Sequence, residues 1–273
     1  MFQSAYNMTL GGWFMIKENI KYCDSCVFEG MTSISALIGA IESGNNDRKI
    51  QKIYFDKEKT KSKARELGFL RAKSFVHNFE IEFVSADKLS SFTVGSTHGG
   101  IVALCSDRSF FPLSEEKITK NGIYFYIEGI EDPYNFGNSI RSLYALGVDG
   151  LVVGERNWFS SAGIVARSSA GTSELLNVYT SFDICNAIDL FRAQGYKIIC
   201  AGIRDSVSIF EADLSAPVFI ILGGEKRGIS RKILDMADTI VRIDYGNKFS
   251  GSLSSSASCA IFAYEALRGK SIT

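Results

Sequence analysis

Asn135 and Arg141 are the most informative polar residues of this sequence, six positions apart at the start of a helical pattern. They follow the apolar run 123–127, and Asp132 or Asn135 is a suitable N-cap, with Pro133 tolerated in the first turn. Six residues are nearly two helical turns, so we expect both side chains on one side of the loop–helix junction. A helix N-terminus and a guanidinium group together form an anion-binding site. Taken alone, the pattern also fits a structural cap and a surface arginine.

A second segment, residues 222–230, joins an expected strand to a glycine-rich turn. The apolar run 218–222 predicts a buried strand, and Gly223 and Gly224 follow its last residue directly. Adjacent glycines let a ligand approach the backbone, and Glu225 adds a carboxylate at the carboxyl edge of the sheet, where ligands of α/β proteins bind. The spacing is neither GxGxxG nor GxxxxGK[ST], so dinucleotide and P-loop nucleotide sites are not favoured.

A third segment, residues 243–256, is a polar loop that leads into a helix. Ser254, Ser255 and Ser256 each offer an N-cap, and the following apolar residues recur at helical spacing. The loop could be a simple connection, but its length and serine content favour a binding loop.

Short apolar runs at 123–127, 150–153, 197–200, 218–222 and 239–243 alternate with helical patterns. Such alternation predicts an α/β domain with a parallel sheet covered on both faces. The first half predicts a smaller α/β unit with helices at 33–41 and 57–67 and strands at 53–55, 81–84 and 100–105. Periodicity is lost around Pro112. We therefore expect a first domain at 1–108, with residues 1–28 as an extension, a linker at 109–120 and a second domain at 121–273.

Charge and cysteine content limit the class of protein. Thirty basic residues balance thirty acidic ones, so an anionic partner must be recognised by a local patch. Six scattered cysteines are typical of reduced cytoplasmic thiols, and the Cys23–Cys26 pair lacks the further ligands of a zinc site, so we expect no metal. No apolar run reaches the ~18 residues of a membrane span, and residues 1–13 lack a secretion signal. These features predict a cytoplasmic protein without a membrane partner.

The segment from Arg48 to Lys73 holds ten basic and three acidic residues, a local excess of seven positive charges. Such a face attracts a phosphate backbone with salt-sensitive affinity. A solvated helix face is the alternative interpretation.

In their order along the chain, the three segments resemble the three motifs of the SpoU/TrmH branch of the SPOUT RNA 2′-O-ribose methyltransferases, over residues 122–269. Residues 166–172 resemble the small-residue segment of that family. Residues 30–44, the strand at Ile53 and residues 97–103 look like its substrate-binding domain, which is related to RNA-binding ribosomal proteins. The resemblance implies a deep trefoil knot, S-adenosyl-L-methionine as cofactor, a homodimer through the knotted domain and an RNA partner. The separate first domain favours ribosomal RNA over transfer RNA.

The resemblance also implies roles for single residues. Cofactor contacts, largely through the backbone, fall on Leu222, Gly223, Gly202, Ile243, Ser252 and Leu253. The polar residues around the acceptor ribose, expected to be catalytic, are Asn135, Arg141, Glu225 and Ser254. RNA contacts in the first domain fall on Arg48, Lys57, Lys59, Lys61, Lys63 and His98.

An arginine remains protonated, so we interpret Arg141 as an electrostatic stabiliser of the developing 2′-alkoxide, supplied by either subunit of the dimer. Glu225 is expected to orient Arg141 or Asn135. The third motif departs from the family's Ser-Leu-Asn, because Ser254 stands at the asparagine position. Three consequences are open: Ser254 suffices for the role of that asparagine, a neighbour such as Asn247 compensates for it, or activity is reduced.

Two alternatives stay open. The chain could be a catalytically silent RNA-binding or ribosome-assembly factor that retains the fold, because of Ser254. It could also methylate a base nitrogen, although the spacing of Asn135 and Arg141 favours the ribose.

Overall fold

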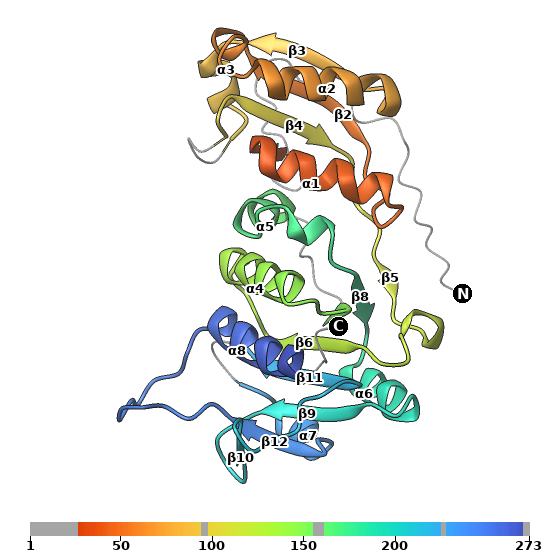
Figure 1. The fold of residues 1–273 in the computed structure, drawn as a ribbon, viewed down its shortest axis with the longest axis vertical. Coiled ribbons are helices and arrows are strands. Elements are labelled where there is room, and N and C mark those ends of the chain that lie inside the picture. The colour runs from red at the N-terminus through yellow and green to blue at the C-terminus, as the bar shows by residue number, and fades with distance from the viewer. Residues whose placement is uncertain (1–26, 94–97, 155–160, 225–227, 270–273) are drawn as a thin grey trace, which may run out of the picture.

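The structure, a computed structural model, describes residues 27–93, 98–154, 161–224 and 228–269. Two domains lie one above the other along the long axis of the molecule (Figure 1). The first is built on a four-stranded mixed sheet with the strand order β1-β4-β2-β3. Its strands are β1 (Val27–Glu29), β2 (Ile50–Asp56), β3 (Glu80–Val84) and β4 (Ile101–Cys105).

Alternate residues of this sheet face two separate cores. Ile53 and Phe55 pack with the helices α1 (Gly30–Glu42) and α2 (Ala64–His77) on one face. Tyr54 and Val102 pack on the other face with Leu89 of the short helix α3 (Ala86–Ser90). The period of two along a strand produces this division.

The second domain contains an eight-stranded sheet in which every pairing is parallel. Its strand order is β10-β12-β9-β11-β6-β7-β8-β5. The strands are β5 (Phe111–Pro112), β6 (Ile123–Glu128), β7 (Gly150–Gly154), β8 (Val178–Ser181), β9 (Lys197–Ala201), β10 (Val207–Ser208), β11 (Val218–Gly223) and β12 (Thr239–Arg242).

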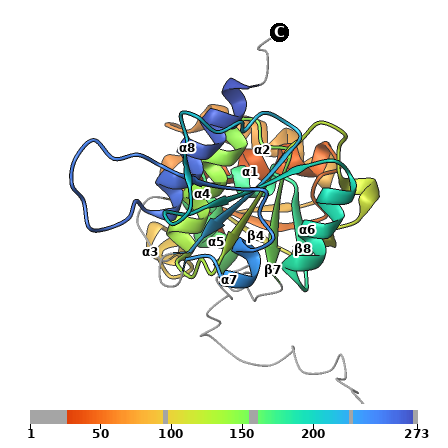
Figure 2. The same ribbon diagram turned by 90° about the horizontal axis from the view of Figure 1, so that it is seen from below.

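Helices cover both faces of this sheet (Figure 2). One face packs on α4 (Pro133–Ala145), α5 (Ala162–Ser168) and α8 (Ser255–Arg268). The other packs on α6 (Ile184–Ala193) and α7 (Arg231–Leu234), with Phe191 and Phe219 stacked at 4.1 Å between ring centroids. The prediction of a parallel sheet covered on both faces is confirmed.

Most differences from the predicted elements involve short segments. The helix expected at 57–67 is wrong in position, because residues 57–59 form a 3₁₀ turn and α2 begins only at Ala64. Asp56 stabilises that turn by accepting a hydrogen bond from the backbone N–H of Glu58 at 3.0 Å. Strands β1, β8 and β10 were not predicted, since two to four residues carry too little periodicity.

The segment predicted as a linker, 109–120, is partly built into the second sheet. β5 pairs in parallel with β8, and the N–H of Leu113 donates to the carbonyl oxygen of Thr180 at 2.9 Å. Pro112 is tolerated there because β5 is an edge strand.

α1 lies against α5 and the turn that follows it, so the two domains are in direct contact (Figure 1). Gly171, in this turn, has a φ of +85°, and a Cβ atom there would lie 2.5 Å from the Cβ of Ala36 and 3.1 Å from the Cα of Ser33. No side chain fits at this position without moving α1.

Replacing Gly171 by alanine should therefore destabilise the protein through both backbone strain and overpacking. We expect Gly171→Ala to lower the free energy of unfolding by about 2–4 kcal/mol in urea denaturation. Gly147→Ala is the matched control, because Gly147 has a φ of +70° but no atom within 4 Å of the new Cβ. Equal losses in the two variants would contradict the close packing at Gly171.

Candidate functional site

Four neighbouring strands, β12, β9, β11 and β6, end at one edge of the second sheet. Because these strands are parallel, their carboxyl ends meet there, where ligands of open α/β sheets bind. Leu222 and Gly223 end β11, Gly202 follows β9, and Ile243 follows β12. Four of the six predicted cofactor contacts are thus brought together from three separate parts of the chain. The side chain of Leu222 is buried in the core, so it can offer only its backbone at this edge.

Gly223 and Gly224 are required by close packing of the protein backbone. A Cβ atom on Gly223 would lie 2.7 Å from the Cα of Gly228, and one on Gly224 would lie 2.3 Å from the carbonyl oxygen of Glu128. We expected these glycines to admit a ligand to the backbone. The structure shows a packing role for them, because Gly228 of the same turn lies beside Gly223 and the turn after β6 lies beside Gly224. The approach of a ligand to their backbone stays a prediction. Glu225 lies outside the described residues.

Glu128 connects the turns that end β6 and β11. Its carboxylate Oε2 accepts a hydrogen bond from the N–H of Ser230 at 3.0 Å. Gly223 pairs with Glu128 in the ladder between β11 and β6. Two of the three sequence motifs are thus held in fixed register at the carboxyl edge.

The first motif forms the turn before α4 and the helix itself. Asp132 is the N-cap, accepting from the N–H of Tyr134 at 3.1 Å, and Pro133 is the first helical residue. Asn135 therefore lies inside the helix, where its carbonyl oxygen accepts from the hydroxyl of Ser139 at 2.8 Å. Of the two predicted caps, Asp132 is confirmed.

Asn135 and Arg141 do not share one side of α4. Both are helical residues, and six steps of a helix place them about 120° apart around the axis. The expectation of one shared side is therefore wrong, because six residues make only about 1.7 helical turns. Arg141 is exposed and forms no ion pair with another residue that the structure describes.

The third motif forms the connection from β12 to α8 and the start of that helix. Ser254 is the N-cap of α8, as predicted for the serine run: its Oγ accepts from the N–H of Ala257 at 3.2 Å and lies 3.0 Å from the hydroxyl oxygen of Ser256. Ser252 and most of this connection are exposed. The N–H of Leu253 donates to the hydroxyl of Tyr245 at 3.3 Å, and the connection projects far from the body of the domain (Figure 2).

α4 and α8 pack against each other through small buried residues. Ser139 of α4 and Cys259 of α8 are both fully buried and hydrogen-bonded to each other. Burial raises the pKa of the Cys259 thiol to about 12, so it remains protonated and unreactive. The four cysteines of the described residues are buried and form no disulfide, while Cys23 and Cys26 lie outside these residues.

The basic segment of the first domain is less uniform than its composition suggests. Arg48 is only 3% exposed and pairs with Glu174 at 3.0 Å, so its predicted RNA contact is wrong. Lys52 pairs with Glu80 and Glu82 of β3. Charge counting could not separate these buried or paired cations from solvated ones, because their acidic partners lie elsewhere in the chain.

Lys57, Lys59, Lys61 and Lys63 form a basic turn between β2 and α2. Lys59 and Lys63 reach the glycines that precede β4: a Cβ atom on Gly100 would lie 2.7 Å from Cδ of Lys59, and one on Gly99 would lie 3.8 Å from Nζ of Lys63.

His98 precedes these glycines and is 8% exposed. Its Nδ1 accepts from the N–H of Gly100 at 3.1 Å, and burial lowers the pKa of its imidazole, which favours the neutral ring. His98 therefore shapes the turn that the lysines surround and offers little surface of its own.

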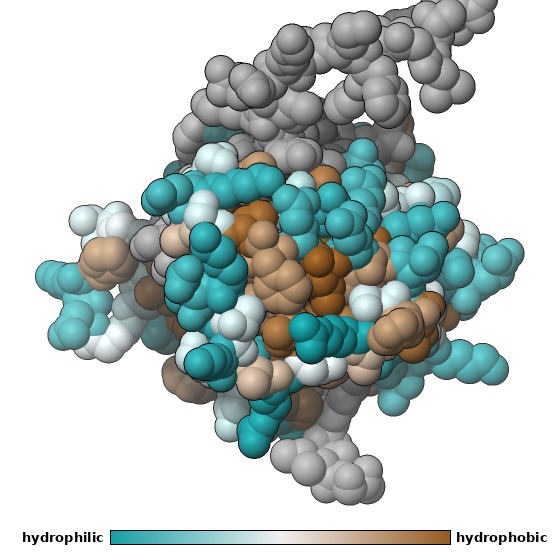
Figure 3. Space-filling model, turned by 90° about the horizontal axis from the view of Figure 1, so that it is seen from above, coloured by the Kyte–Doolittle hydropathy of each residue, from teal (hydrophilic) through white to brown (hydrophobic). Residues whose placement is uncertain are grey.

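Beside the basic turn, the outer face of the first domain is apolar at its centre (Figure 3). The exposed apolar side chains of α2 and β3 are Phe69, Phe75, Val76 and Phe83. The outer face thus combines apolar side chains with the exposed guanidinium groups of Arg65 and Arg71 on α2.

Metal and membrane features are absent from the part of the chain that the structure describes. It contains no group of three or more histidine, cysteine, aspartate or glutamate residues suited to hold a metal ion. None of its helices combines the length and the apolar character of a membrane-spanning segment.

Two family models match this chain. Residues 122–264 match the SpoU rRNA Methylase family, and residues 34–111 match the RNA 2′-O ribose methyltransferase substrate binding family. The chain belongs to the SpoU rRNA methylase family. It is therefore an RNA 2′-O-ribose methyltransferase of the SpoU/TrmH type that carries the substrate-binding domain, and the family resemblance found in the sequence is confirmed.

Similar proteins share both domains. A putative TrmH family tRNA/rRNA methyltransferase, YacO, of Bacillus subtilis is 23% identical over 84% of this chain and 92% of its own length. The 23S rRNA (guanosine-2′-O-)-methyltransferase RlmB of Shewanella oneidensis is 26% identical over 72% of this chain and 81% of its own.

Two solved structures share the fold over most of both chains. An AdoMet-bound rRNA methyltransferase of Sinorhizobium meliloti has a TM-score of 0.73 and 20% identity, covering 89% of this chain and 87% of its own. AviRb of Streptomyces viridochromogenes, in complex with AdoMet, has a TM-score of 0.72 and 23% identity, covering 89% of each chain.

The cap at Ser254 predicts how this position tolerates change. Ser254→Ala should lower the free energy of unfolding by about 1 kcal/mol because the N–H of Ala257 loses its partner, whereas Ser254→Asn should keep the cap. Urea denaturation checks both values. A loss in Ser254→Asn as large as that in Ser254→Ala would contradict the capping role.

Proposed function

We propose that this protein transfers the methyl group of S-adenosyl-L-methionine to a ribose 2′-hydroxyl of ribosomal RNA, as a cytoplasmic homodimer. The observation that carries the proposal is the convergence of Gly202, Leu222, Gly223 and Ile243 at one sheet edge, next to the caps of α4 and α8. The two-domain match to this family supports it.

The residues at this edge fit S-adenosyl-L-methionine. They are neutral and largely apolar or without side chains, so they would hold an adenine through backbone groups and apolar contact, without phosphate recognition. Gly202, Gly223, Ile243 and Leu253 would hold the cofactor. When bound, it supplies a methyl group already activated by a sulfonium centre.

The chain's own contribution is then positioning and electrostatics. The enzyme must hold a ribose 2′-oxygen in line with the methyl group. Arg141 would stabilise the developing alkoxide and hold the neighbouring phosphate, and Asn135 would hydrogen-bond the ribose. Glu225 is proposed to orient one of them. The oxygen of Ser254 accepts at the cap and lies 3.0 Å from the hydroxyl of Ser256, so its one hydroxyl hydrogen reaches the ribose only when Ser256 is the donor of that pair.

The position of Arg141 supports a dimer. Arg141 lies eight residues into α4, about 12 Å along the axis from the start of the helix. The carboxyl edge of the sheet lies at the start of this helix, so Arg141 is displaced from it. An arginine supplied by the partner subunit would bring this charge to the edge. We propose that the dimer forms through the C-terminal motifs and that these motifs form the family's trefoil knot.

The basic turn supports an RNA role for the first domain. Figure 1 places the start of β4, which the lysines surround, on the same side of the molecule as the connection between β12 and α8. Lys57, Lys59, Lys61 and Lys63 would bind RNA phosphates, with His98 shaping the turn. A separate domain of this kind favours large folded ribosomal RNA over transfer RNA, which is a family analogy.

A catalytically silent RNA-binding factor is the second candidate, favoured by Ser254 in place of the family asparagine. Mapping 2′-O-methyl sites in total RNA with and without the protein separates the two, and nucleoside digestion of the RNA separates ribose from base methylation. An unchanged map would support the silent factor.

Arg141→Ala should reduce methyl transfer by at least about 100-fold, because it removes the charge that stabilises the alkoxide. Titration calorimetry should show the affinity for S-adenosyl-L-methionine within a few-fold of the wild type. Arg192→Ala, on α6 at the opposite face of the sheet, is the control. Retained turnover in Arg141→Ala would remove this assignment.

Neutralising the basic turn tests the RNA face. Replacing Lys57, Lys59, Lys61 and Lys63 by glutamine should weaken RNA binding and reduce the slope of log K against log salt by up to about 3–4. The control replaces four exposed lysines outside the turn, Lys88, Lys117, Lys120 and Lys232. An unchanged slope would show that the turn is merely solvated.

A further inference from the structure

α1 is attached to the second domain along its N-terminal half and beyond both ends. In its first turn, the hydroxyl of Ser33 donates to the carbonyl oxygen of Ala166 at 3.4 Å, next to the close contact of Gly171 with Ala36. Ala166 belongs to α5, yet it is fully buried in the core of the first domain. The two domains therefore share a continuous packed interior at this point.

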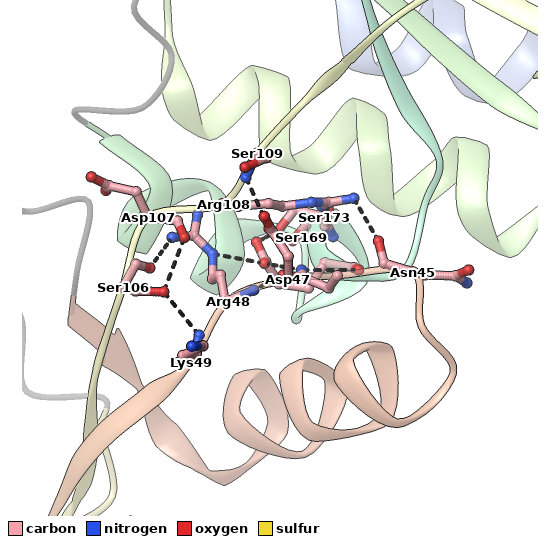
Figure 4. Close-up of polar contacts among 12 residues, drawn as sticks. Asn45, Asp47, Arg48, Lys49, Ser106, Asp107, Arg108, Ser109, Ser169 and Ser173 are labelled. Atoms are coloured by element: carbon pink, nitrogen blue, oxygen red, sulfur yellow. Dashed lines mark hydrogen bonds and ion pairs between the residues drawn. The ribbon is translucent and has the colours of Figure 1, made fainter. Parts of the chain in front are cut away.

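Beyond the C-terminal end of α1, a carboxylate of the second domain is buried among groups of the first. Oε2 of Glu174 accepts from Nδ2 of Asn46 at 2.6 Å and from Nε of Arg48 at 3.0 Å. Nη1 of Arg48 also donates to the carbonyl oxygen of Ser106 at 2.7 Å (Figure 4). The side chains of Arg48 and Glu174 are 3% and 4% exposed. Removing either partner would leave a buried charge without compensation.

A second guanidinium joins the same turn to the chain that enters the second domain. Nη1 of Arg108 donates to the carbonyl oxygen of Ser173 at 2.8 Å, and Nη2 donates to that of Asn45 at 3.4 Å (Figure 4). Burial lowers the pKa of Arg108 and the nearby Glu174 carboxylate opposes this, so the arginine stays charged. Asn45 and Arg48 are thus both tied to the segment 173–174.

At the N-terminal end of α1, Arg167 of α5 connects the first domain to α4. Its Nη1 donates to Oε2 of Glu29 at 3.0 Å, and its Nη2 donates to the hydroxyl of Tyr134 at 2.9 Å. Burial acts to lower the pKa of Arg167, but Glu29 and Tyr134 outweigh it and the pKa is raised. Tyr134 directly precedes Asn135 in the first turn of α4.

We propose that these contacts, here called the α1 seat, hold the substrate-binding domain rigidly on its own catalytic domain, and that Arg48, Arg167 and Glu174 are positioning residues for methyl transfer. The seat comprises Glu29, Ser33, Asn46, Arg48 and Arg108 on one side and Ala166, Arg167, Gly171, Ser173 and Glu174 on the other. It fixes the separation between the basic turn and the carboxyl edge. This inference rests on the proposed function. With a fixed separation, the enzyme selects an RNA whose segment at the basic turn and whose reactive ribose are the same distance apart.

Rigidity can be measured without any RNA. Spin labels at Ala72 of α2 and Asn186 of α6, both exposed, report the distance between the domains by double electron–electron resonance. Cys23 and Cys26 are replaced by serine, and the labelled protein is diluted with unlabelled protein so that an assembly carries one labelled subunit. A second pair of labels at Tyr144 and Asn186, both in the catalytic domain, measures how much the labels' own motion broadens a distance distribution. We expect the two distributions to be equally narrow, and a broad interdomain distribution would overturn the proposal.

Two variants test the residues of the seat. Glu174→Gln keeps the shape of the side chain and removes the charge that balances Arg48. Arg167→Met removes the Arg167–Glu29 pair, which is less buried than the Arg48–Glu174 pair. It therefore still tests the seat if Glu174→Gln fails to fold. Arg167→Lys keeps one of its two donors, and Arg192→Met is the matched control on α6. We expect broadened distances in Glu174→Gln and Arg167→Met, partial rescue in Arg167→Lys, and no change in Arg192→Met.

Methyl transfer to ribosomal RNA from cells that lack the protein gives the functional readout. In Arg167→Met we expect kcat/KM for this RNA to fall about 10–100-fold, with unchanged affinity for S-adenosyl-L-methionine, because the RNA is held at varying distances from the site. A variant with a broad interdomain distance distribution but unchanged methyl transfer would overturn the positioning role. Narrow distributions in both Glu174→Gln and Arg167→Met would show that these residues do not hold the domains in place. Narrow distances in a wild type that transfers no methyl group would refute the proposed function and leave the rigid seat standing.

Discussion

The arrangement of this molecule depends on the parallel pairing of β12, β9, β11 and β6. Parallel hydrogen bonding forces all four carboxyl ends to one edge, although the strands come from distant parts of the chain. The turn after β11 then packs so closely on the turn after β6 that Gly224 has no room for a side chain, and the same turn folds back so tightly that Gly228 leaves none at Gly223. That contact keeps two motifs in register, and a site built there depends on backbone groups whose positions the sheet determines.

The second constraint is the joining of the two domains through α1. A domain that captures RNA can deliver it to a catalytic edge either by a flexible linker or by fixed geometry. Here the segment between the domains forms β5 of the catalytic sheet, and the buried Arg48–Glu174 pair lies across the contact. A shifted orientation of the domains would bury one of these charges without the other, so the arrangement favours a single orientation.

In the first domain, composition predicts where basic residues are concentrated, but only the structure shows which of them are paired with acidic residues. Ten basic residues between Arg48 and Lys73 correctly indicated a region rich in cations. Their roles differ because of acidic partners far away in the sequence: Arg48 pairs with Glu174, Lys73 with Glu42, and Lys52 with β3. The lysines of the turn at 57–63 form a compact surface of net positive charge beside an apolar face on α2, although Lys63 pairs with the nearby Glu66 at 3.3 Å.

The sequence by itself determined the family, the parallel sheet, the strands of five or more residues and a short set of candidate caps for α4 and α8, because these depend on local periodicity and on residue types at fixed spacing. Tertiary structure decided that β5 belongs to the catalytic sheet, and that Gly171, Arg167 and Glu174 lie at the contact between the domains. The contacts between the domains join residues more than a hundred positions apart, as between Asn46 and Glu174 or Glu29 and Arg167. Local sequence patterns therefore cannot predict them. They exist only when the packed cores bring those groups within hydrogen-bonding distance.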